Sequence, residues 1–265
     1  MSGDAKKGIS RSIAMAQGKA REQRLQRVRK ALDERLGDPI PVLDALMAEL
    51  GEGYPQGELW EKLHAASVRD GLEAALGEAY RRCAAGPRMK RLEVEAQAVV
   101  LMHAADFFRG VAGDEAAAED FVERTVNISP AHVEAFGRYE QRLERLRDAR
   151  RLLELYSKVA SAPPRPAAVL ATQVLNRVLQ LPATEPLPDP TCKRLLALVP
   201  TNPRLLPALD KHCAATKRYS LACELLEEAV ADPAAPPDLL VPWRERLVQL
   251  YLGEAAAPAS AMPHV

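Results

Sequence analysis

The sequence has 265 residues and a mass of 29.0 kDa; 48% of the residues are hydrophobic, 5% are aromatic and 27% are charged. These values fit a folded chain with a buried core and exclude an extensively disordered one, while the scarcity of aromatic residues argues against an all-β sandwich. Thirty-six Lys and Arg residues balance thirty-six Asp and Glu residues, which excludes a global field that recruits nucleic acid or an anionic membrane.

The first predicted element is a basic helix at the N-terminus. Residues 1–32 carry nine Lys or Arg residues against two Asp or Glu residues. A narrow apolar helix face is indicated by the spacing of Leu25, Val28, Leu32 and Leu36. The basic candidates on the other faces are Arg21, Arg24, Arg27 and Lys30. They are interpreted either as a solvated or docking face, or as a surface that contacts phosphates or an acidic protein.

A short second helix is predicted from about Val42 to Leu50, before a turn-rich segment that ends at Pro55. From Gly57 onward, the pattern alternates between helices and short turns. We therefore predict three parts: a basic helical N-terminal extension (1–55), a helical repeat domain (56–252) and a loose C-terminal tail (253–265).

The predicted repeat domain contains internal similarity. Pro130 and Pro200 lie 70 residues apart, and the segments that follow them superpose without a gap. The apolar matches are Phe136 with Leu206, Tyr139 with Leu209, Leu143 with Cys213, Leu152 with Ala222, Tyr156 with Leu226 and Val159 with Ala229. This offset is twice 35, which indicates a repeat of 34–35 residues with two helices each. Neither helix can bury its apolar face alone, so neighbouring repeats are expected to stack.

The spacing of Trp60, Leu63, Gly71 and Tyr80 resembles that of the tetratricopeptide repeat, a 34-residue helical hairpin. Further copies are predicted at roughly 133–166 and 203–236, while eight extra residues near 86–97 lengthen the first copy. A poorer copy at about 167–202 contains several prolines that delay its second helix to about 190–199. The resemblance implies an all-α, right-handed α-solenoid of stacked antiparallel helical hairpins, with the N-terminal helices as an extension.

The same resemblance implies a binding groove. In tetratricopeptide arrays, the first helices of successive repeats line a concave surface that binds extended or helical peptides. The matching positions in this sequence are His103, Phe107, Arg138, Gln141, Arg145, Arg204 and Lys211. Because this set is mostly basic, the expected ligand is an acidic peptide or helix of another protein. The Lys/Asn pattern with which the family grips a C-terminal carboxylate is not reproduced.

The sequence offers no recognisable catalytic motif. It has no nucleophile elbow and no glycine-rich phosphate loop, and His212, Cys213 and Cys223 lack the paired short spacing of a zinc site. We therefore predict no catalytic residues, no metal and no cofactor. The absence of a secretory signal and of a long apolar run predicts a cytoplasmic chain with no membrane span.

The most specific functional prediction is a non-catalytic scaffold or adaptor for protein–protein interaction. Two alternatives remain: binding of nucleic acid or an anionic surface through the basic N-terminal helix, and an enzyme whose site is built from scattered helical residues. The partner and the state of homo-oligomerisation are not predicted.

Overall fold

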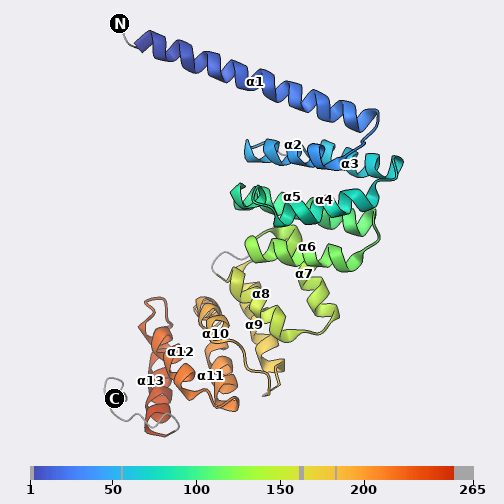
Figure 1. The fold of residues 1–265 in the computed structure, drawn as a ribbon. Coiled ribbons are helices and arrows are strands. Elements are labelled where there is room, and N and C mark those ends of the chain that lie inside the picture. Colours follow the sequence, from blue (N-terminus) through green and yellow to red (C-terminus); the bar gives the residue numbers. More distant parts are fainter. Residues whose placement is uncertain (1–2, 55, 161–163, 183, 254–265) are drawn as a thin grey trace. The chain divides into compact units, whose positions relative to one another are not determined.

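The computed structural model describes residues 3–54, 56–160, 164–182 and 184–253, with side chains from residue 18 onward. Within these residues, all regular secondary structure is helical, in thirteen α-helices and two 3-10 helices. The predicted all-α class is therefore confirmed. The chain forms two compact units, Met1–Ser129 and Pro130–Val265 (Figure 1). None of the described helices is long and apolar enough to cross a membrane.

Unit 1 contains the two predicted N-terminal helices together with the first repeats. Its elements are α1 (Gly3–Asp33), α2 (Pro39–Gly51), α3 (Gly57–Arg69), α4 (Glu73–Ala85), η1 (Met89–Arg91), α5 (Val94–Gly110) and α6 (Glu115–Ile128). Helix α2 lies at the centre of this packing, because it contacts α1, α3, α4 and α5. The boundary predicted at residue 55 therefore does not coincide with an edge of a compact unit.

The second half of α1 is integrated into this core. The apolar face predicted from the sequence is buried, with exposed fractions of 3–4% for Leu25, Val28, Leu32 and Leu36. The end of the helix is fixed by two polar contacts from α3: Arg69 Nη1 donates to the Leu32 carbonyl at 2.8 Å, and the Leu36 N–H donates to Asp70 at 2.6 Å. The apolar face of the second half of α1 is therefore packed within unit 1.

Unit 2 consists of stacked helix pairs. Its elements are α7 (Val133–Arg145), α8 (Ala149–Val159), α9 (Ala167–Gln180), α10 (Asp189–Leu195), η2 (Leu196–Leu198), α11 (Leu205–Ala215), α12 (Tyr219–Ala231) and α13 (Pro237–Leu252). Helix α8 contacts α10, α9 contacts α11 and α10 contacts α12, so three helices of this unit pack on the next but one. The delayed helix near residue 190 is confirmed as α10, and α13 follows the last hairpin. Residues 254–265 of the predicted tail lie outside the described residues.

A recurrent turn joins the two helices of four hairpins. It places a residue at positive φ: Gly71 at 68°, Gly113 at 65°, Arg147 at 54° and Lys217 at 57°. After Gly71, Arg147 and Lys217, the next N–H donates to the carbonyl five residues earlier, at 2.8, 3.0 and 2.8 Å, which closes the helix end. The separations of 42, 34 and 70 residues match the repeat, with eight extra residues after the first turn.

The repeat packing yields a stability prediction. Ala222 has no exposed surface on α12, so Ala222→Leu is expected to overpack the helix contact and lower the free energy of unfolding by about 1–3 kcal/mol. Chemical denaturation followed by the fluorescence of Trp243 measures this effect. The matched control is Ser220→Leu on the exposed face of the same helix, which should change stability by less than about 0.5 kcal/mol. Equal effects of the two variants would contradict the packing argument.

Candidate functional site

The structure separates the groove residues that the sequence predicts. In unit 1, His103 is half-buried on α5 and stacks on Trp60 with ring centroids 4.7 Å apart. Phe107, one turn later, has 0% exposed surface and contacts the rings of Tyr80 and Phe108. Helix α5 contacts α2, α4 and α6, and this crowding directs Phe107 into the core. Phe107 therefore does not face a groove.

The other predicted groove residues lie in unit 2. Arg138, Gln141 and Arg145 are carried by α7, whereas Arg204 precedes α11 and Lys211 lies on it. Arg138 is partly buried and pairs with Glu134 at 2.6 Å, while the remaining four side chains are exposed. The main contacts of α7 are with α8, and those of α11 are with α9 and α12. These contacts do not assemble the five side chains into one site.

The basic N-terminal helix is divided by its contacts with α2. Arg21 Nε donates to Glu49 at 2.8 Å, and Arg24 Nη2 reaches Glu49 at 2.5 Å and Glu52 at 2.9 Å. The carboxylate of Glu49 has no exposed surface, so these two arginines compensate a buried charge. Arg27 and Lys30 are exposed on the same helix. Two of the four predicted basic residues are therefore engaged inside unit 1.

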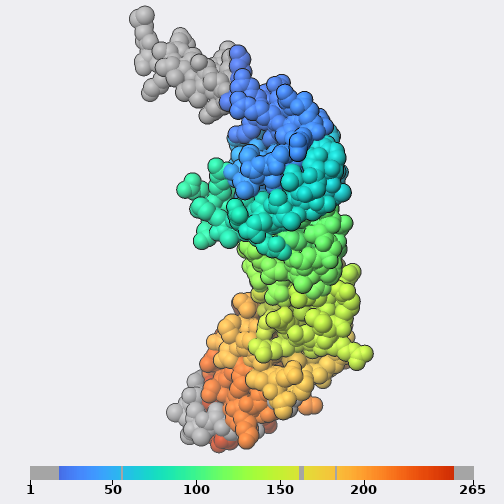
Figure 2. Space-filling view, turned by 45° about the vertical axis from the view of Figure 1, so that its right-hand side comes forward, coloured from blue at the N-terminus to red at the C-terminus, as the bar shows by residue number. Residues whose placement is uncertain are grey.

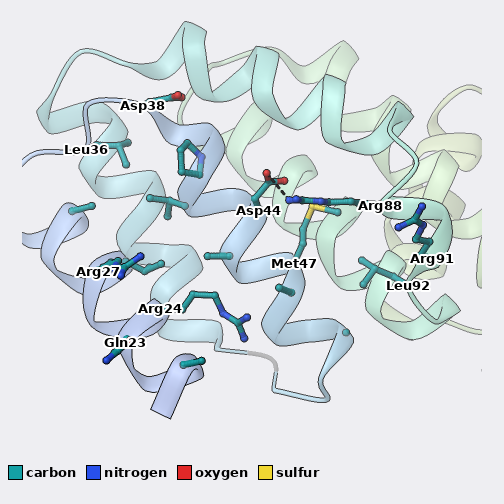
Figure 3. Close-up of a pocket in the computed structure, with 18 residues that line it drawn as sticks. Gln23, Arg24, Arg27, Leu36, Asp38, Asp44, Met47, Arg88, Arg91 and Leu92 are labelled. Carbon is teal, nitrogen blue, oxygen red and sulfur yellow. Dashed lines mark ion pairs between the residues drawn. The ribbon is translucent and has the colours of Figure 1, made fainter. Parts of the chain in front are cut away.

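Arg24 and Arg27 line a hollow of unit 1. It is an open groove of about 1120 Å³ between the second half of α1, one side of α2 and the connection that contains η1. Figure 3 shows the lining side chains converging from these three elements. In Figure 2, the connection between α4 and α5, in teal, projects from the side of unit 1 next to the blue residues of α1 and α2. The groove is thus built within one compact unit.

The lining of the groove is aliphatic where it is not charged. Its larger apolar side chains are Val28, Leu36, Val42 and Met47, which are only 2–5% exposed, and the half-buried Leu92; alanines from α1 and α2 lie between them. The end wall forms because Gly51 has no side chain: a Cβ there would lie 3.2 Å from Leu92 Cδ2. No aromatic residue is among those that line the groove. The surface thus offers an aliphatic floor with a narrow end.

The charges at the rim of the groove are predominantly basic. Four arginines and two aspartates line it, namely Arg24, Arg27, Arg88, Arg91, Asp38 and Asp44. Arg88 is bound to Asp44 at 2.5 Å (Figure 3), and Arg24 is held by Glu49. Within the described part of the chain, Arg27 and Arg91 form no ion pair. These two exposed guanidinium groups are available for a ligand.

Sequence reasoning did not find Arg88, Arg91 and Asp44. The signal for the first two was the eight-residue lengthening of the first repeat, because insertions in repeat proteins map to one face that often binds ligands. The lengthened connection contains η1 and carries both arginines to the groove. Asp44 gave no such signal, because a single acidic residue on a helix usually indicates a solvated face.

A second polar group lies between α3, α4 and α5. His64 Nε2 and the Tyr80 hydroxyl are 2.8 Å apart, and the His64 ring packs against Phe107 with centroids 5.4 Å apart. The pKa of His64 is lowered to about 4, mainly by burial and also by the positive charge of His103, while Asp106 opposes the shift. Burial also raises the pKa of Tyr80, so its hydroxyl keeps its proton. This cluster holds a neutral histidine in the core.

The remaining features of the described residues add little chemistry. A cavity of about 430 Å³ in unit 2 lies between η2, α12 and α13, with Glu228 and Asp232 as its charged residues. Among the described residues, no group of three or more His, Cys, Asp or Glu side chains is placed to hold a metal ion. Comparison with known proteins found no matching family model and no significantly similar curated protein.

Proposed function

We propose that this protein is a non-catalytic interaction scaffold or adaptor that binds an acidic, partly apolar segment of another protein in the groove of unit 1. The proposal includes a right-handed, tetratricopeptide-like stacking of the helical hairpins within each unit, and the cytoplasmic location predicted from the sequence. Two observations support the fold: the recurrent positive-φ turn, and the contact of α8, α9 and α10 with the next helix but one in unit 2.

The observation that carries the function is the combination of an aliphatic floor with two arginines that form no ion pair within the described residues. Arg27 and Arg91 stand beside a groove whose other charges are mostly neutralised, as Arg88 is by Asp44. An apolar segment gains free energy by burial on the floor, and carboxylates gain hydrogen bonds from the guanidinium groups. A ligand with both features is therefore favoured over a purely ionic one.

The alternative of nucleic-acid binding through α1 is less well supported. Arg21 and Arg24 neutralise a buried carboxylate, which leaves Arg27 and Lys30 as the exposed members of that basic set. Binding to phosphates depends on the number of available cations and falls steeply with salt. An oligonucleotide that binds tightly at low salt, with loss of affinity in Arg27→Glu/Lys30→Glu, would favour this alternative.

A selection of displayed random peptides tests the proposed function. Peptides that bind the full chain are expected to be rich in Asp, Glu and aliphatic residues, and the double variant Arg27→Glu/Arg91→Glu should weaken their binding at least tenfold. The control Arg194→Glu/Arg244→Glu changes the same charge at exposed positions of unit 2. The variant Arg138→Glu/Arg145→Glu/Lys211→Glu tests the alternative that peptides bind the basic residues of unit 2 that the sequence predicted to line a groove. The groove assignment would be contradicted if the selected peptides bind Arg27→Glu/Arg91→Glu as tightly as the unaltered chain but do not bind this triple variant.

A further inference from the structure

We infer that the occupant of the groove is an amphipathic α-helix of a partner protein, with acidic residues on both flanks of its apolar face. This inference rests on the proposed function and adds the conformation of the ligand and the placement of its charges. Three features of unit 1 support it: the elements that form the groove, the composition of its floor and the positions of its two unpaired arginines.

The first feature is that the described residues lack the surfaces to which extended and polyproline peptides commonly bind. An extended peptide commonly adds a strand to an exposed sheet edge, and the described residues contain no strand. A polyproline segment commonly docks in an aromatic-lined groove, whereas no aromatic residue lines this one. Neither an extended strand nor a polyproline segment is therefore matched by the groove.

The second feature is a floor that suits the surface of a helix. Two helices, α1 and α2, provide most of the lining, and the half-buried Leu92 adds an aliphatic side chain next to Arg91 (Figure 3). A third helix packs into the space between two others when small residues let it approach and aliphatic side chains meet its apolar face. Here the small residues are Ala20, Ala31, Ala45, Ala48 and Gly51.

The third feature is the placement of the two arginines. Arg27 projects from α1 and Arg91 from η1, on opposite sides of the apolar floor in Figure 3. A helix that lies on the floor between them presents one flank to each guanidinium group. Glutamate on both flanks then meets a cation on each side, whereas lysine on the flanks meets like charges. The rim therefore selects the charge on both flanks of the occupant.

A designed peptide tests the inference on the full chain. The probe is a fluorescently labelled, alanine-based helix of about five turns, about 18 residues, with leucines on one face and glutamates on both flanks. Two matched peptides replace either two central alanines with prolines or all the flanking glutamates with lysines. Fluorescence anisotropy at about 0.15 M salt should show at least tenfold weaker binding for both matched peptides.

Charge reversal in the protein provides the decisive comparison. In Arg27→Glu/Arg91→Glu, the preference should invert, so that the lysine-flanked helix binds more tightly than the glutamate-flanked one. Both positions are exposed, and circular dichroism should show an unchanged helix content. If the proline-containing acidic peptide binds as tightly as the helix, the helical occupant is ruled out while the proposed function stands. If the glutamate-flanked and lysine-flanked helices bind equally well, the proposed function fails together with the inference. If the glutamate-flanked helix does not bind, the inference is overturned.

Discussion

The double variant Arg21→Ala/Arg24→Ala is expected to destabilise unit 1 severely, although both residues belong to a helix that the sequence presents as a basic extension. Both arginines bind Glu49, whose carboxylate is completely buried on α2. Removing them leaves that carboxylate in the core without its cations, and such orphaned charges cost about 3–5 kcal/mol. Chemical denaturation measures this loss in a Trp243→Phe background, where Trp60 is the remaining tryptophan and reports on unit 1.

A matched control lies on the same helix. Arg27→Ala/Lys30→Ala removes the same amount of charge from exposed positions and should change the free energy of unfolding by less than about 0.5 kcal/mol. The variant Glu49→Leu in the Arg21→Ala/Arg24→Ala background should restore much of the stability, because it replaces the orphaned charge with an apolar side chain. Equal effects of the two double variants would show that Glu49 does not depend on α1.

Much of the helical organisation is readable from the sequence because it follows from local rules. The spacing of Leu25, Val28 and Leu32 identifies the buried face of α1, and all three are buried in the structure. Gly71 and Gly113 adopt the positive φ of the hairpin turn, which glycine tolerates at low cost. Arg147 and Lys217 adopt the same φ without being glycines, so composition alone did not mark those turns.

The candidate site is less predictable because it depends on contacts between helices. The sequence identifies Arg21, Arg24 and Arg27 as equivalent positions on a basic helix, and only the approach of Glu49 on α2 distinguishes them. The family pattern assigns Phe107 to a peptide-facing position, but α5 is surrounded by α2, α4 and α6. Tertiary packing decides which face of a helix remains exposed, and a repeat pattern that treats all copies alike does not contain this information.

Acidification is expected to destabilise unit 1 through His64. Its pKa is about 4 in the folded chain, below the ordinary value of 6.5, mainly because burial disfavours the charged ring. The unfolded state therefore binds more protons between pH 6.5 and pH 4, so stability falls as the pH is lowered through this window. The expected loss is about 2 kcal/mol between pH 7 and pH 5.

The variant His64→Gln isolates this contribution, because glutamine does not titrate and its amide oxygen can still accept a hydrogen bond from the Tyr80 hydroxyl. Denaturation of the Trp243→Phe protein at pH 7, 6 and 5 should show a steep loss of stability with His64 and a much flatter profile with His64→Gln. His103 and Asp106 are present in both proteins, so their own titration cancels in the comparison to first order. Parallel profiles would mean that His64 takes up its proton in the folded state as readily as in the unfolded chain, and that its ring is not held neutral by the core.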